Sequence, residues 1–91
     1  MIITLDEMKN YLRVDNDEDD ELITALIESS QKLCMDIARI SDEEAFINEP
    51  CSKVAVMYAV AYQYENRENA NHSALALSIR SLLFGIRREE F

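Results

Sequence analysis

The sequence contains very few of the residues from which turns, catalytic centres and phosphate-binding loops are built. Its 91 residues include one glycine, one proline, one histidine, two cysteines and no tryptophan. A chain with one glycine cannot form a glycine-rich loop that cradles phosphate groups. Because 48% of the residues are hydrophobic and turn formers are scarce, the composition favours a helical protein over a turn-rich β fold or a disordered chain.

The scarcity of histidine and cysteine also leaves few candidates for catalysis or metal binding. His72 falls in a polar stretch that predicts a solvent-exposed loop, and no second histidine exists to complete a metal-binding pair. Cys34 and Cys51 lack metal or redox spacing, so we expect small buried thiols, although a single disulfide between them also fits the count. We predict no metal, no cofactor and no enzymatic activity.

The charge balance excludes a further class of function. The formal net charge is −9, so the chain lacks the basic stripe with which proteins grasp nucleic acid.

Its longest apolar run, residues 54–64, is shorter than the roughly 20 residues that span a bilayer. The first residues do not show the pattern of a signal peptide. We expect one domain, residues 1–91, that does not enter a membrane.

Residues 50–68 are the most informative stretch, because every side chain from residue 54 to residue 64 except that of Gln63 is apolar or aromatic. A helix that is apolar on all sides is surrounded by other elements. Pro50 suits its first turn, where a missing N–H costs no hydrogen bond. We therefore predict an all-α fold, a small bundle of four to five helices around a central apolar helix at about residues 50–68.

One face of this central helix combines apolar residues with two carboxylates. At about 100° per residue, that face consists of Val54, Tyr58, Ala61, Glu65 and Glu68. We expect the carboxylates to continue the line of an apolar face that packs in the core. They then either lie just past the core and pair with arginines, or belong to a surface at residues 64–68 that contacts another chain. Both interpretations can hold together.

Two helices are predicted before the central one. Thr4 and Glu7 match a capping box, which predicts a short helix that ends near Leu12. Asp17 is the expected cap of a long amphipathic helix at about residues 19–38, because acidic residues favour the positive end of a helix dipole.

The acidic segment before the long helix has some similarity to a calcium-binding loop. Asp15, Asp17 and Asp19 alternate as the first ligands of such a loop do. The sixth position is Asp20 instead of glycine, and the twelfth is Leu26 instead of the bidentate glutamate. We therefore interpret the segment as a helix N-terminus and not as a calcium site.

Two more helical segments are predicted from capping residues. Ser41 and Glu44 match a second capping box before a short turn of helix. Ser73 is the expected cap of a last helix over residues 74–84, and Gly85 is placed to end it in a left-handed turn. The side chains expected to face inward from that helix are Leu75, Ile79, Leu82 and Leu83.

The few arginines of this acidic chain indicate how it assembles. Arginine makes directional, paired hydrogen bonds to carboxylates, which suits Arg67, Arg87 and Arg88 to a subunit contact. We predict that the acidic N-terminal half of one copy meets the arginines of the next. Such a head-to-tail contact closes into a ring when the rotation between copies permits.

Two motifs, with the segments between them, resemble a known family. The motifs are T-L-D-E-M-K-N-Y-L-R-V at residues 4–14 and Y-E-N-R-E at residues 64–68; an acidic segment and a long amphipathic helix lie between them, and L-L-F-G-I-R follows. In this order they resemble the phage head–tail connector (head-completion adaptor) proteins of long-tailed phages. Residues 69–76 depart from the pattern, because they lack a proline or glycine turn before the last helix.

The resemblance implies a structural virion protein at the head–tail junction, made in the cytoplasm of the bacterial host. It implies a ring of about a dozen copies beneath the portal, joined to the next connector or stopper protein, through which DNA passes without sequence-specific binding. The family has no catalytic residues to transfer. The candidates for contacts with other subunits or with the portal are Tyr64, Glu65, Arg67, Glu68, Arg87 and Arg88.

Two other functions are weighed against this one. A small helical regulatory or DNA-binding-type protein would act as a monomer or dimer and would not co-purify with a portal ring. A hydrolase that uses Glu65 and Glu68 as acid and base would lose its activity, and not its assembly, when both become glutamine. We expect the opposite, namely that this double change impairs folding or assembly.

Overall fold

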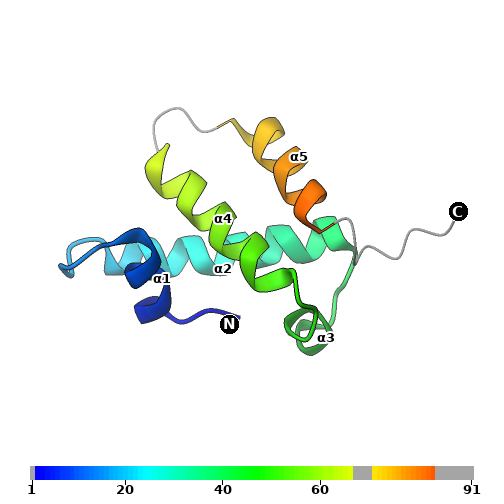
Figure 1. The fold of residues 1–91 in the computed structure, drawn as a ribbon, viewed down its shortest axis with the longest axis horizontal. Coiled ribbons are helices and arrows are strands. Elements are labelled where there is room, and N and C mark those ends of the chain that lie inside the picture. The colour runs from blue at the N-terminus through cyan, green and yellow to red at the C-terminus, as the bar shows by residue number, and fades with distance from the viewer. Residues whose placement is uncertain (1, 67–70, 84–91) are drawn as a thin grey trace, which may run out of the picture.

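The computed structural model describes residues 2–66 and 71–83, and these residues form helices joined by short connections (Figure 1). The helices are α1 (Leu5–Leu12), α2 (Asp20–Ala38), α3 (Glu43–Ile47), α4 (Ser52–Glu65) and α5 (His72–Leu82). No strand occurs within the described ranges. The prediction of an all-α bundle of four to five helices around the helix at about residues 50–68 is confirmed.

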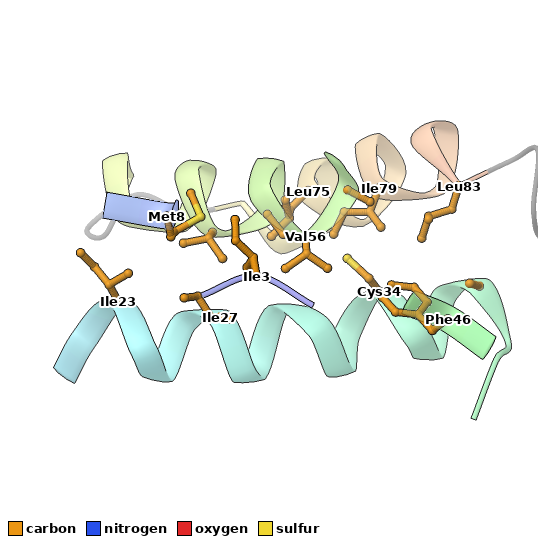
Figure 2. Close-up of a cluster of buried hydrophobic side chains, with 14 residues drawn as sticks. Ile3, Met8, Ile23, Ile27, Cys34, Phe46, Val56, Leu75, Ile79 and Leu83 are labelled. Carbon is orange, nitrogen blue, oxygen red and sulfur yellow. The ribbon is translucent and has the colours of Figure 1, made fainter. Parts of the chain in front are cut away.

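The long helix α2 forms one side of the bundle, and α1, α4 and α5 lie against it (Figures 1 and 2). The pairing of α2 with α4 is the most extensive, and α5 packs on both of them. The core fills the space between α2 and the other helices (Figure 2). Its fully buried large side chains include Ile3, Met8, Ile23, Ile27, Phe46, Val56, Leu75, Ile79 and Leu83.

Helix α4 is covered on one face and open on the other. The face against α2 carries small residues, Ser52, Ala55, Val56, Ala59 and Val60, and all of them are buried. Small side chains let two helix backbones approach closely, so this face packs on α2 although bulkier apolar residues lie opposite.

The predicted inward face of α4 therefore points outward. Val54 is 56% exposed and Tyr58 is 36% exposed, while Glu65, one turn beyond Ala61, is exposed. The expectation that other elements surround this helix on all sides was wrong. Hydrophobicity alone did not separate the face that packs on α2 from the face that remains open.

The polar residue inside the apolar run has a partner across the main helix contact. The Gln63 Nε2 group donates a hydrogen bond to the Ser30 hydroxyl at 2.8 Å and another to the Ala59 carbonyl at 3.1 Å. Ser30 is fully buried in α2. Because buried polar groups cost free energy unless they are hydrogen-bonded, this pair fixes how α4 lies on α2.

The first predicted capping box is confirmed. The Thr4 hydroxyl accepts a hydrogen bond from the Glu7 N–H at 3.1 Å, and the Glu7 carboxylate accepts one from the Thr4 N–H at 3.0 Å. Helix α1 ends at Leu12, as expected, and Arg13 follows in the left-handed conformation with φ 62°. Helix α2 covers the predicted span and ends in the same way, with Arg39 at φ 62°.

Two predicted caps were wrong, because neighbouring residues occupy the N-cap positions. Asp17 does not cap α2, since Asp19 occupies the N-cap position and the Asp17 carboxylate accepts a hydrogen bond from Lys9 Nζ at 3.2 Å. The second capping box does not form, because Asp42 and not Ser41 precedes α3. The next residue, Glu43, accepts a hydrogen bond from Gln31 Nε2 at 2.7 Å.

The start of α5 also differs from the prediction. Asn71 is its cap, and the Asn71 side chain accepts a hydrogen bond from the Ala74 N–H at 3.0 Å, so Ser73 is not the cap. His72 is the first residue of the helix and not a loop residue, although it is exposed as expected. Leu82 was expected to face inward but is 36% exposed. Gly85 lies outside the described residues.

Candidate interaction surface

The residues predicted to contact other proteins are only partly covered by the structure. Tyr64 and Glu65 form the C-terminal end of α4. Arg67, Glu68, Arg87 and Arg88 lie outside the described residues, so their role as contact residues stays a prediction.

Tyr64 connects two helices within the protomer. Its hydroxyl donates a hydrogen bond to the Asp19 carboxylate at 2.6 Å, and its ring is half-buried. Because Asp19 is the residue before α2, the bond ties the C-terminal end of α4 to the N-terminal end of α2. A short hydrogen bond to an ionised group is stronger than one between neutral groups.

Glu65 points to a different side of α4 and lines an open groove of about 500 Å³. The groove lies between the C-terminal end of α1 and the outward face of α4, and we call it the tyrosine groove. It is lined by Tyr11, Leu12, Arg13, Tyr58, Ala61, Tyr62, Glu65 and Asn66. Among these residues, Glu65 was a predicted contact residue, and Asn66 lies within the predicted surface at residues 64–68.

The aromatic side chains of the tyrosine groove differ in how firmly they are held. The rings of Tyr58 and Tyr62 stack with their centroids 6.3 Å apart, and the Tyr62 hydroxyl accepts a hydrogen bond from the Asn71 N–H at 3.1 Å. Tyr11, across the groove on α1, is 53% exposed. Exposed tyrosines that frame a hollow are typical of protein contact surfaces, because they bury large area at little entropic cost.

A second open apolar feature lies on α5. Leu77 is 63% exposed, more than the other large hydrophobic residues of the described chain. Its helical neighbours on the same side, Ala74 and Ser81, are small and exposed, so Leu77 stands out from a flat surface. We call Leu77, Ala74, Ser81 and the exposed Arg80 the α5 outer face.

A second hollow, of about 420 Å³, lies where α2 meets the segment before α3. Gln31, one of the polar residues that line it, is 7% exposed. The Gln31 carbonyl accepts a hydrogen bond from the Ile2 N–H at 2.8 Å, and its amide donates to the Glu43 carboxylate. That bond holds the pKa of Glu43 below its ordinary value. Both ends of the Gln31 side-chain amide are thus engaged within the protomer.

Ion pairs attach α1 to its neighbours. Lys53 Nζ on α4 lies 2.8 Å from the Glu7 carboxylate, and this bond is the main reason that the pKa of Glu7 is lowered. Lys9 Nζ lies 2.8 Å from the Asp20 carboxylate and 3.2 Å from that of Asp17, and the bond to Asp20 is the main cause of a raised Lys9 pKa. These pairs hold one wall of the tyrosine groove in place.

Groups for metal binding or disulfide formation are scarce in the part of the chain that the structure describes. No three residues among its His, Cys, Asp and Glu are grouped to hold a metal ion. Cys34 and Cys51 are both free thiols, and burial raises the pKa of Cys34 to about 12. None of the described helices is long and apolar enough to cross a bilayer. No Asp or Glu is buried within residues 2–66 and 71–83.

These features define a class: a small helical bundle whose exposed apolar side chains gather on helix surfaces, as in proteins that assemble with other polypeptides. The chain belongs to the family of Phage gp6-like head-tail connector proteins, whose family model matches residues 2–89. It is thus a structural connector protein of the phage head–tail junction, and the predicted resemblance is confirmed. No curated protein and no solved structure matches the chain.

Proposed function

We propose that the protein forms a closed ring beneath the portal of the phage head and links the portal to the next connector or stopper protein. DNA passes through the ring on packaging and on ejection. The match of almost the whole chain to the head–tail connector family carries this proposal. The ring contains about a dozen copies, as the resemblance implies. Each copy is one domain, residues 1–91, made in the cytoplasm of the bacterial host.

The two open surfaces of the protomer support assembly into a ring. The tyrosine groove and the α5 outer face are different in shape and lie on different helices. A closed ring needs two different surfaces on each copy, because every contact in it is head to tail. A symmetric dimer would need one self-complementary surface.

The proposed contact residues are those of the sequence prediction. Glu65 is exposed and lines the tyrosine groove, where a neighbouring subunit or the portal can reach it. Arg67, Glu68, Arg87 and Arg88 are proposed to make further contacts. Tyr64 contributes by fixing the end of α4 through its bond to Asp19.

The test is to mix the purified protein with its cognate portal ring and to follow both by gradient sedimentation and electron microscopy. We expect the protein to sediment with the portal and to add a ring-shaped layer to it. The proposal would be refuted if the protein, added in molar excess over the portal, still sediments alone as a monomer or dimer. The isolated protein need not form rings, because the portal can template them.

A further inference from the structure

The α5 outer face is the least acidic helical surface in the described part of the chain. Helix α5 contains no Asp or Glu, whereas α1, α2, α3 and α4 each contain at least one. It carries the cation Arg80 three residues after the protruding Leu77. For a chain with a net charge of −9, this helix meets another copy with the smallest charge repulsion.

The tyrosine groove lies where the acidic N-terminal half of the chain meets the near-neutral C-terminal half. Residues 1–49, which contribute α1 to the groove, contain 14 of the 18 acidic residues and only 4 of the 9 basic ones. Residues 50–91 are close to neutral, with four acidic and five basic residues. A contact between the two halves of different copies therefore meets less charge repulsion than a contact between two N-terminal halves.

The arrangement of the helices prevents a protomer from filling its own groove. Helix α4 lies between α1 and α5, so the helices that carry Tyr11 and Leu77 are on opposite sides of it (Figure 1). Both surfaces are thus available to other copies. The leucine projects from its surface, while the aromatic side chains frame a hollow, so their shapes are complementary as well.

We infer that the α5 outer face of one copy packs into the tyrosine groove of the next, with Leu77 between the tyrosines and Arg80 directed to Glu65. The two charged residues of the groove are Glu65 and Arg13, so a helix with one cation and no carboxylate fits best with its cation at the Glu65 end. This inference rests on the proposed ring and specifies which surfaces meet in it.

The test uses cysteine pairs in the portal-bound protein. Tyr11→Cys and Leu77→Cys are combined in a Cys51→Ser background, and a short bismaleimide crosslinker is added. Cys34 can stay, because it is fully buried and its raised pKa keeps the thiol protonated. We expect the combined variant to give a ladder of covalent multimers on a denaturing gel, while the variants with only Tyr11→Cys or only Leu77→Cys remain monomeric.

The other outcomes overturn the inference in distinguishable ways. Dimers from Leu77→Cys alone would mean that α5 meets α5, and crosslinks from Leu77→Cys to the portal would mean that α5 binds a different polypeptide. Rings seen by electron microscopy without a ladder would refute the contact and leave the proposed function standing. If wild-type protein forms no ring on the portal, the proposed function and the inference fail together.

A matched pair of substitutions provides an independent readout. Leu77→Asp should reduce the number of copies bound per portal by about tenfold or more, because it places a charge in the contact. Ile47→Asp introduces the same charge at another exposed hydrophobic residue, 40% exposed on α3, and should change binding less than about twofold. Both variants should melt near the wild-type temperature. Equal effects of the two on assembly would refute the placement of Leu77.

Discussion

Tyr64 and Glu65 are adjacent in the chain, but their side chains serve different purposes. The Tyr64 hydroxyl is bonded to Asp19 inside the protomer, whereas Glu65 is exposed in the tyrosine groove. The Y-E-N-R-E motif thus combines a residue that stabilises the fold with one that is open to a partner. Substitutions at the two positions should affect different measurements.

Tyr64→Phe removes the bond to Asp19 and should lower the free energy of unfolding by about 1–2 kcal/mol, as expected for a hydrogen bond to a charged group near the surface. Urea unfolding followed by circular dichroism measures it. Tyr11→Phe, which removes a hydroxyl from an exposed ring, is the control and should change stability little. Glu65→Gln should leave unfolding unchanged and weaken portal-dependent assembly; a large loss of stability in Glu65→Gln would place this residue in the fold instead.

The Glu7 carboxylate makes the stability of the folded protein depend on pH in the acidic range. Its pKa in the folded protein is below the ordinary 4.5, chiefly because of the hydrogen bond from Lys53 and also because of the backbone bond from Thr4. A lowered pKa stabilises the folded state above the ordinary value, and the contribution is lost as the pH falls through the lowered pKa. We therefore expect stability to fall below pH 4.5.

Glu7→Gln should be less stable than wild type at neutral pH and should lose less stability on acidification. Glu44→Gln, which removes a charge from an exposed side chain on α3, is the matched control. Urea unfolding at neutral pH and well below pH 4.5 compares the three proteins. If Glu7→Gln and Glu44→Gln lose the same stability on acidification, the bond to Lys53 does not contribute to acid sensitivity.

At the scale of elements, the pairing of α2 with α4 holds the bundle together. The small residues of α4 permit a close approach, and the Ser30–Gln63 bond fixes the alignment of the two helices. This bond is costly to break, because the group that remains loses a hydrogen bond inside the helix contact.

Ser30→Ala should accordingly destabilise the protein by about 1–3 kcal/mol, since it leaves the Gln63 amide with only the Ala59 carbonyl. Adding Gln63→Met, which removes the second polar group and keeps a similar shape, should restore part of that loss. Thermal or urea unfolding of the two single variants and the double variant measures the coupling. Strictly additive losses would show that the two side chains do not act together.

Local sequence patterns predicted the helices better than they predicted the contacts between residues far apart in the chain. The Thr4 and Glu7 box and the span of α2 follow from nearest-neighbour chemistry, and they were predicted correctly. The caps at Asp17, Ser41 and Ser73 failed because several capping residues lie close together in each segment. Which of these residues caps the helix depends partly on bonds to residues elsewhere in the chain, such as the bond of Asp17 to Lys9.

The interaction surface could be predicted only in part for the same reason. Glu65 was identified from its motif, and the spacing of Tyr58 and Tyr62 on α4 is a local signal that could have marked an aromatic surface. Tyr11 joins them only because α1 packs beside α4, which no local pattern shows. The predicted inward residues of α5 did not include Leu77, and Leu75, Ile79 and Leu83 are buried as predicted. How far Leu77 is exposed depends on how α5 packs on α4 and α2, which periodicity does not show.

At the scale of the whole molecule, the net charge of −9 bears on the passage of DNA. An acidic surface repels phosphates, so the channel of the proposed ring would let DNA slide without adhering. We predict that portal-bound rings, or the protein alone, do not retain duplex DNA at physiological salt. Fluorescence anisotropy with labelled duplexes of unrelated sequence measures this, and a histone-like basic protein is the positive control. Tight binding at that salt would contradict a non-adhesive channel.

The most direct test of the central claim is a cryo-electron microscopy map of the protein on its cognate portal, at a resolution that separates helices. We predict a closed ring in which the α5 outer face of each copy contacts α1 and α4 of its neighbour around Tyr11, Tyr58 and Glu65. A ring whose α5 helices face the DNA channel or contact one another, or a portal with no added ring, would contradict it.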